Sequence, residues 1–134
     1  MLGYPSRKTR GQAEGGFTMI EVLVAVLVLA IGLLGVASVQ LLSMQQTSNA
    51  NLRSQVTLHI QDMAEQLRAN GGNALGATAM AEWKSRLQRE LGANADVTVS
   101  VASEQATIKI SWREKDSFEA NKYKDHELEL KAGL

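Results

Sequence analysis

Hydrophobic residues form one long uninterrupted run, followed by shorter periodic patterns. The run covers 28 residues, from Phe17 to Met44. As a helix it would be ~42 Å long at ~1.5 Å per residue, against ~30 Å for the hydrocarbon core of a bilayer. A buried core helix is the alternative, but the 90 residues that follow could not enclose a helix that is apolar on every face. The pattern therefore predicts a membrane-spanning helix.

The helix is predicted to continue past the membrane as far as Asn70. Apolar residues recur there at every third or fourth position, which makes one stripe that should pack on a globular domain. The sequence Asn70-Gly71-Gly72-Asn73 then supplies residues that tolerate the left-handed conformation at a helix C-terminus. The stripe consists of Leu52, Val56, Ile60, Met63 and Leu67.

Residues 71–134 are predicted to form a small globular head. A second apolar stripe predicts one additional helix, which Gly92 ends. The fold class is therefore α+β, with a long N-terminal helix packed on a small antiparallel sheet. The second stripe consists of Met80, Trp83, Leu87 and Leu91, and both tryptophans, Trp83 and Trp112, are expected in the core.

Alternation of apolar and polar residues predicts the strands of the head. A tight turn at Ser103-Glu104 should join the first two strands, and Leu128 and Leu130 indicate a short third one. The segment Glu114–His126 is expected to be a charged, solvated loop. The first two strands are marked by Val97, Val99 and Val101, and by Ile108, Ile110 and Trp112.

Composition removes several classes of function. The net charge is zero, so there is no basic excess that favours nucleic acid. The absence of cysteine excludes disulfides, thiolate catalysis and Cys-ligated metals. No phosphate-binding glycine loop or metal-ligand spacing appears. The two histidines are His59, expected to pack at the rim of the stripe, and His126, so we expect no catalytic, cofactor or metal site.

The charges that flank the apolar run predict its orientation. Arg7, Lys8 and Arg10 precede the run with only Glu14 opposing them, and the next cation is Arg53. By the positive-inside rule the N-terminus stays in the cytoplasm and the C-terminal part is exported.

The apolar run is too long for an ordinary secretory signal, whose cleavage site would follow it. The better candidate is the bond between Gly16 and Phe17, because Gly15-Gly16 is flexible and has no side chain to obstruct a protease. A cut there would leave the whole apolar helix on the mature protein. It would also place a free α-amine four residues before Glu21, the one acid at the edge of the run.

The segment Gly16-Phe17-Thr18-Met19-Ile20-Glu21 resembles the type III signal, G|FTxxE, of type IV pilin precursors. The continuation EVLVAVLVLAIGLLGVASVQ is similar to minor pilins of the PilV type. The resemblance implies cleavage after Gly16 by a prepilin peptidase, N-methylation of Phe17, and attraction between Glu21 and the Phe17 amine of a neighbouring subunit during assembly. It divides the chain into a cleaved leader (1–16), a long helix (17–70, apolar in 17–44) and a head (71–134).

Elementary electrostatics is consistent with this role for Glu21. An acid at the centre of a membrane helix costs roughly 2.5–3.5 kcal/mol, and opposite charges ~4 Å apart attract by about 4 kcal/mol at an effective dielectric constant near 20. Pairing could therefore offset burial, which favours subunits that enter the filament in register. The alternative is a helix-start acid that favours the N-terminal dipole.

The resemblance implies a non-catalytic minor pilin of a type IV pilus, in the bacterial inner membrane and then at the cell surface. The expected partners are other major and minor pilins, the prepilin peptidase, the inner-membrane assembly platform and membrane lipid. Two differences from major pilins fit a minor pilin: Val36–Gln40 has no proline, and the head cannot close a disulfide. A pseudopilin of a type II secretion system and a membrane-tethered enzyme or sensor domain remain as alternatives.

Overall fold

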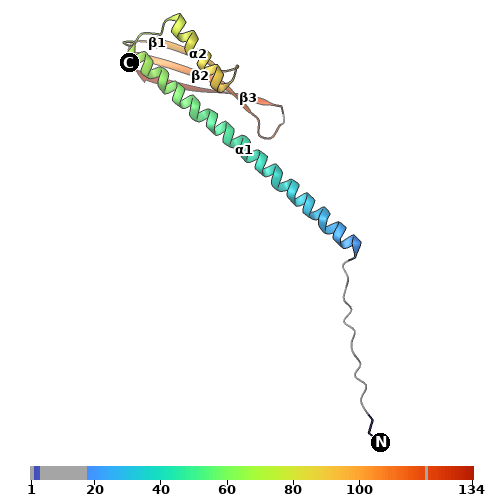
Figure 1. Cartoon of the computed structure of the whole chain (residues 1–134). Helices are drawn as coiled ribbons and strands as arrows, with labels where there is room; N and C mark the ends of the chain where they lie inside the picture. Colours follow the sequence, from blue (N-terminus) through green and yellow to red (C-terminus); the bar gives the residue numbers. More distant parts are fainter. Residues whose placement is uncertain (1, 4–17, 120) are drawn as a thin grey trace. The chain divides into compact units, whose positions relative to one another are not determined.

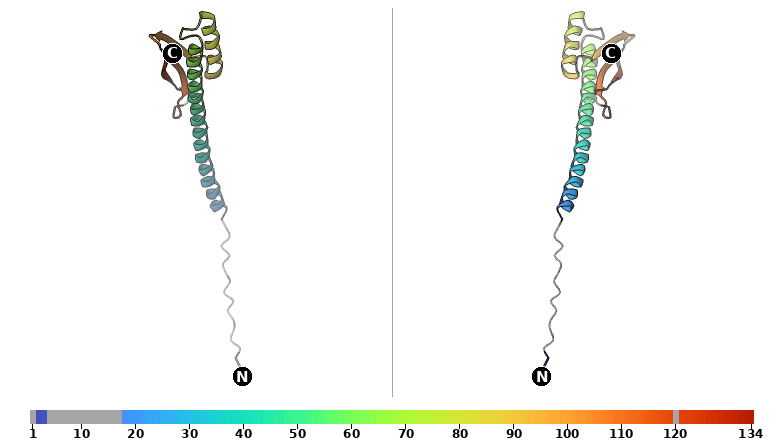
Figure 2. Two further views of the ribbon diagram at one scale, coloured as in Figure 1. Left: turned by 90° about the vertical axis from the view of Figure 1, so that its left-hand side faces the viewer. Right: turned by 90° about the vertical axis from the view of Figure 1, so that its right-hand side faces the viewer.

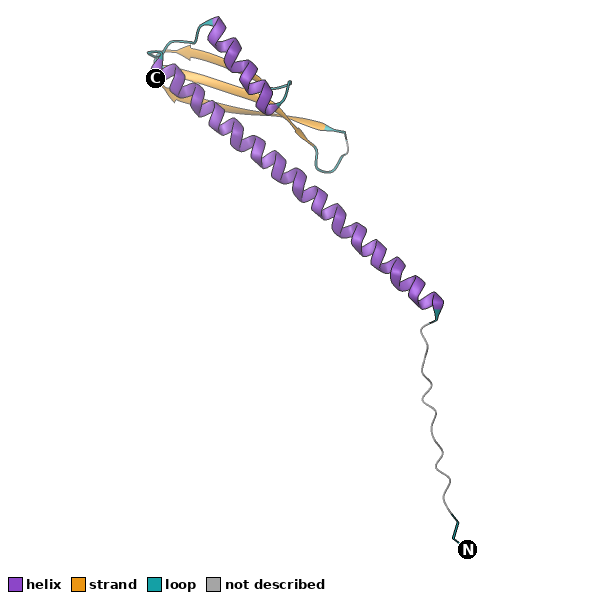
Figure 3. Cartoon of the chain, in the orientation of Figure 1, coloured by secondary structure: helices purple, strands orange, loops and turns teal. Residues whose placement is uncertain are grey.

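The computed structural model describes residues 2–3, 18–119 and 121–134, and contains two helices and one three-stranded sheet (Figures 1 and 3). The predicted α+β class is confirmed. The chain divides into two compact units, Met1–Ser38 and Val39–Leu134; we call the second the head unit. The elements are α1 (Met19–Ala69), α2 (Ala77–Leu91), β1 (Asp96–Ala102), β2 (Gln105–Lys115) and β3 (Tyr123–Gly133).

Helix α1 ends where its glycines predict. The Gly72 N–H donates to the carbonyl of Leu67 (2.9 Å) and the Gly71 N–H donates to that of Arg68 (3.0 Å), which is the Schellman pattern. Both glycines have positive φ, 69° and 78°. A side chain at either position would be strained, so the sequence stops the helix here and turns the chain toward α2.

The strands form one antiparallel sheet in the order β1-β2-β3. The two-residue turn between β1 and β2 is at Ser103 and Glu104, as predicted, and both residues have positive φ (46° and 62°). That geometry matches the right-handed twist of paired strands. The register brings Ile108 opposite Val99 and Leu130, and Ile110 opposite Val97 and Leu128. The middle strand carries the most deeply buried large apolar residues of the inner sheet face, whereas those of the two outer strands are partly buried.

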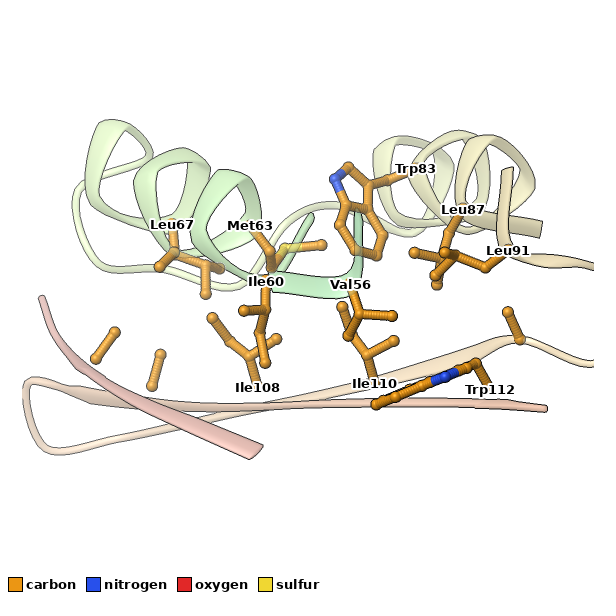
Figure 4. Close-up of a cluster of buried hydrophobic side chains, with 14 residues drawn as sticks. Val56, Ile60, Met63, Leu67, Trp83, Leu87, Leu91, Ile108, Ile110 and Trp112 are labelled. Atoms are coloured by element: carbon orange, nitrogen blue, oxygen red, sulfur yellow. The ribbon is translucent and has the colours of Figure 1, made fainter. Parts of the chain in front are cut away.

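The core lies between this inner face and the two helices (Figure 4). The stripe of α1 packs there as predicted: Val56, Ile60, Met63 and Leu67 are at most 2% exposed, and Leu52 is partly buried. Helix α2 lies beside the C-terminal part of α1 (Figure 2) and adds Trp83, Leu87 and Leu91, also as predicted. The strands contribute Ile108, Ile110 and Trp112 from β2, with the small side chains of Ala106 and Ala132 beneath the helices.

The predicted loop Glu114–His126 is wrong at both ends. Strand β2 continues to Lys115 and β3 begins at Tyr123, and these two residues are paired. The third strand is accordingly longer than the short one expected from Leu128 and Leu130. The expectation of a solvated segment is also wrong for Glu114 and Asp116, which are 3% and 7% exposed. Alternation simply continues past Trp112, so every second side chain still faces inward even though it is charged.

The buried carboxylate of Glu114 joins α1 to the β2–β3 hairpin. Arg53 binds both of its oxygens, with Nε at 2.7 Å from Oε1 and Nη2 at 2.8 Å from Oε2. The Nε1–H of Trp112 also donates to Oε1 (3.0 Å), and Nε2 of His126 lies 3.4 Å from Oε2. The ring of His126 stacks on Trp112, with centroids 5.8 Å apart. Each oxygen of this buried acid is therefore satisfied, as burial requires.

These contacts fix the ionised form of Glu114. The hydrogen bonds from Arg53, and then from Trp112, hold the pKa of the Glu114 carboxyl below its usual value, with burial opposing them. Because the pKa of Glu114 is lower in the folded protein than in the unfolded chain, its ionised form stabilises the fold. This stabilisation is complete at pH values above the ordinary glutamate pKa, and it is lost as the pH falls through the lower pKa of the folded state.

We predict that Leu67→Ala lowers the free energy of unfolding of a fragment of residues 50–134 by about 2–5 kcal/mol, because it leaves a cavity under α1. Leu58→Ala is the matched control: Leu58 lies on the same helix but is 66% exposed. Its effect should stay within about 0.5 kcal/mol. Urea unfolding followed by circular dichroism measures both, and equal effects would show that the stripe does not pack on the sheet.

We predict that Glu114→Gln lowers the stability of the same fragment at pH 7 by about 1.5–3 kcal/mol, because charge-assisted hydrogen bonds are lost. It should also reduce the loss of stability as the pH falls below about 4.3, the ordinary glutamate pKa. Glu127→Gln is the control, since Glu127 pairs with Lys109 on the exposed sheet face (3.0 Å) and such pairs contribute little. Thermal melts from pH 2 to 7 test this, and an unchanged acid slope in Glu114→Gln would contradict it.

Candidate assembly surface

The predicted processing residues lie outside the described part of the chain. Gly16, Phe17 and all of the leader 1–16 except residues 2 and 3 belong to the undescribed segment. The cleavage after Gly16 and the methylated amine of Phe17 therefore stay predictions. The described site begins at Thr18.

Glu21 lies in the first turn of α1 and is exposed. The carbonyl of Thr18 accepts hydrogen bonds from the N–H groups of Glu21 (2.9 Å) and Val22 (3.3 Å), so Thr18 directly precedes the first turn. Thr18 and Glu21 thus have the spacing of a capping box, in which the two side chains bond each other's backbone N–H. Within residues 18–119 no hydrogen bond from either side chain is recorded. The structure is compatible with two roles for Glu21: an acid that stabilises the helix start, and an acid that is available to another chain.

The first half of α1 exposes apolar side chains on every side. The consecutive residues Leu27, Val28 and Leu29 are 54%, 65% and 62% exposed. Because successive helical residues point ~100° apart, three exposed in a row cover the circumference. The helix is long and apolar enough to cross a membrane, and none of its most apolar window is buried among the described residues. An apolar surface of this size marks a membrane or protein contact.

Polar side chains at the end of this segment bond within the helix. Ser38 Oγ donates to the Leu34 carbonyl and Thr47 Oγ1 to that of Ser43, both at 2.9 Å. Their hydroxyl donors are therefore already satisfied without water, which lowers the cost of placing them in a weakly polar environment. Together with the absence of formal charge from Val22 to Leu52, this makes the helix compatible with burial well beyond its most apolar part.

A second exposed surface lies at the tip of the β2–β3 hairpin. Phe118 is 83% and Tyr123 is 60% exposed, whereas Trp83 and Trp112 are buried. The tip is held by Asp116, whose Oδ1 accepts the backbone N–H of Phe118 (2.8 Å) and of Glu119 (3.3 Å). The other oxygen of Asp116 pairs with Lys124 at 2.8 Å. The exposed aromatic ring is thus carried on an ordered turn.

The electrostatics of the tip agree with these contacts of Asp116. The hydrogen bond from Lys124, followed by the backbone N–H of Phe118, lowers the pKa of the Asp116 carboxyl to about 2. The group therefore stays ionised over the whole physiological range. The sequence pattern did not identify Asp116, because an aspartate in a charged segment is expected to be solvated. Its position directly after a long strand and before Ser117 is the signal that indicates such a turn.

The two histidines lie apart. His59 packs its ring edge-on against Trp83 (5.9 Å) and its Nε2 lies 2.8 Å from Glu90, which confirms the predicted rim position. His126 belongs to the Glu114 cluster. In the described ranges, no group of three or more histidine, aspartate or glutamate side chains is placed to hold a metal ion.

Comparison with known families gives one match, which covers residues 12–37 and is described as the prokaryotic N-terminal methylation motif. It spans Gly16, Phe17 and Glu21, together with the exposed apolar part of α1 as far as Ala37. Searches of curated proteins and of solved structures returned no match. The motif favours a structural subunit over an enzyme, and with the apolar helix it indicates membrane anchoring. The match supports a type IV pilin-like or pseudopilin-like signal in the N-terminal part of the chain.

Proposed function

We propose that the protein is a minor pilin, a non-catalytic subunit that helps to prime or adjust the assembly of a type IV pilus. The observation that carries the proposal is the two-part helix α1. Its first half is apolar on all sides and carries a methylation motif, while its second half is the central element of a small core. We infer that such a helix lies first in the membrane and afterwards in the core of a filament, and that the head lies on the filament surface.

The proposal includes an order of events. The chain inserts with its N-terminus in the cytoplasm, because cations precede the apolar run. A prepilin peptidase cuts after Gly16 and the new amine of Phe17 is methylated. Glu21 then pairs with the Phe17 amine of a neighbouring pilin as the subunit leaves the membrane through the assembly platform. The domains follow as leader 1–16, helix 17–70 and head 71–134.

The assignment to a pilus rather than to a type II secretion pseudopilus rests on the PilV-like run IGLLGVASVQ. A deletion of the gene in its natural host separates the two. Loss of surface pili and twitching with normal protein secretion supports the proposal. Loss of secretion with normal pili would identify a pseudopilin instead, and loss of neither would favour a membrane-tethered enzyme or sensor.

Processing provides a direct prediction. Gly16→Val should block cleavage, because a branched side chain would crowd the protease against the backbone of the scissile bond. Gly11→Val, upstream in the leader, is the matched control and should be processed normally. Intact-mass analysis of membrane fractions should show the wild type and the control lacking residues 1–16 and carrying one methyl group. Full-length wild-type chain in cells with active prepilin peptidase would reject the predicted site.

Assembly provides a second prediction, on Glu21. Glu21→Ala should insert and be cleaved but enter filaments poorly, because the attraction to the neighbour's amine is lost. Glu21→Gln separates the two accounts of this residue, since a capping box accepts glutamine as well as glutamate. Pairing predicts that Glu21→Gln fails like Glu21→Ala, and that Glu21→Lys is worse because it repels the amine.

The measurement is the fraction of processed protein in sheared pili relative to the membrane pool. Glu65→Gln is the control, an exposed acid on the same helix that pairs only with Arg68 one turn away. It should assemble like the wild type. Normal incorporation of Glu21→Gln with failure of Glu21→Ala would assign Glu21 to the helix start, and normal incorporation of all variants would remove it from assembly.

A further inference from the structure

The hairpin β2–β3 runs along α1 in a fixed direction. At one end, Asn49 Nδ2 donates to the carbonyl of Lys115 (3.0 Å) and Arg53 binds Glu114. At the other end, Arg68 Nε donates to the carbonyl of Gly133 (3.0 Å). The tip end of the hairpin therefore lies beside Asn49 and Arg53, and the C-terminal end of β3 lies beside Arg68 at the end of α1. Figure 3 shows the loop after β2 at the corresponding end of the sheet.

This direction places the tip close to the end of the apolar segment. Met44, 71% exposed, is the last residue of the apolar run and precedes Asn49 by five residues in the same helix. Five residues rise ~7.5 Å. The headgroup region extends about 5–8 Å beyond the hydrocarbon on each side of a bilayer. We place the hydrocarbon boundary near Met44, at the end of the apolar run, which puts Asn49 and the adjoining hairpin end at the height of the headgroups.

The composition of the tip suits that height. Among the described residues, the exposed aromatic side chains are Phe118 and Tyr123, and both are in this hairpin end. Lys115, Lys122 and Lys124 lie within the same stretch of ten residues. Aromatic rings concentrate at membrane interfaces, and lysine side chains lay their apolar stems along the surface with the ammonium in water. The ion pairs of Asp116 with Lys124 and of Glu119 with Lys122 leave the tip without a large net charge.

We propose that the tip of this hairpin, residues 115–119 and 121–124, is an interfacial anchor that inserts Phe118 into the phospholipid headgroup layer while the protein is in the membrane. Tyr123 and the lysines flank the insertion. Asp116 holds the turn, and the Arg53–Glu114 contact holds the hairpin against α1. The anchor fixes the head against the bilayer before assembly. The proposal rests on α1 spanning the membrane, as in the proposed function.

The test uses single cysteines in the full-length chain, which has none of its own. Phe118→Cys, Ser100→Cys and Leu33→Cys are labelled with an environment-sensitive fluorophore and reconstituted in phosphatidylglycerol–phosphatidylethanolamine vesicles. Ser100 is the head control, because it is exposed at the opposite end of the sheet. Leu33 reports insertion of α1. Emission wavelength, quenching by lipids spin-labelled at the headgroup, and quenching by aqueous iodide are measured.

We expect the Phe118→Cys label to shift to the blue, to be quenched by the headgroup spin label and to be shielded from iodide, while the Ser100→Cys label stays aqueous. A lipid signal at Leu33→Cys with an aqueous label at Phe118→Cys overturns the anchor and leaves the proposed function intact. Aqueous labels at both positions mean that α1 is not inserted, which overturns both. Shielding of Phe118→Cys that appears only with other pilins overturns the lipid contact in favour of a subunit interface.

Discussion

The packing of one helical stripe against one strand determines the rest of this structure. Val56, Ile60, Met63 and Leu67 cover Ile108 and Ile110, and all six side chains are almost completely buried. A three-stranded sheet of this size cannot bury its inner face alone, and α2 covers only part of it. The second half of α1 is therefore part of the head's core and cannot be separated from it.

The sequence was most informative where burial and local pattern agree. The stripe of α1, the glycines after Leu67 and the turn at Ser103-Glu104 were all predictable, because each depends on residues close together in the chain. The lengths of β2 and β3 were not, because a buried charge breaks the apolar alternation. Glu114 faces inward only because Arg53, 61 residues earlier, supplies its counter-ion, and such a pairing is invisible to local pattern.

In the candidate assembly surface, Glu21 was predictable from the sequence. A carboxylate near the start of a long apolar run is conspicuous in sequence, and the methylation motif covers it. The structure adds that Thr18 and Glu21 have the spacing of a capping box at the start of α1, which gives Glu21 a second possible use beside the proposed subunit pairing. The role at the helix start and the proposed pairing with a neighbour can follow one another. A helix N-terminus gains from the acid, and in the proposed assembly a neighbour's amine would replace that local interaction.

The position of the first charge after the apolar run links these parts. From Val22 to Leu52 the helix carries no formal charge, and the next residue, Arg53, is the one that binds Glu114. Transfer of a guanidinium into hydrocarbon is unfavourable, so Arg53 limits the part of α1 that can lie in the hydrocarbon core. Because the same side chain binds Glu114, the hairpin is joined to α1 nine residues after Met44, the last residue of the apolar run. In the proposed anchor, the contact that satisfies both oxygens of Glu114 also holds the hairpin that carries Phe118 against α1.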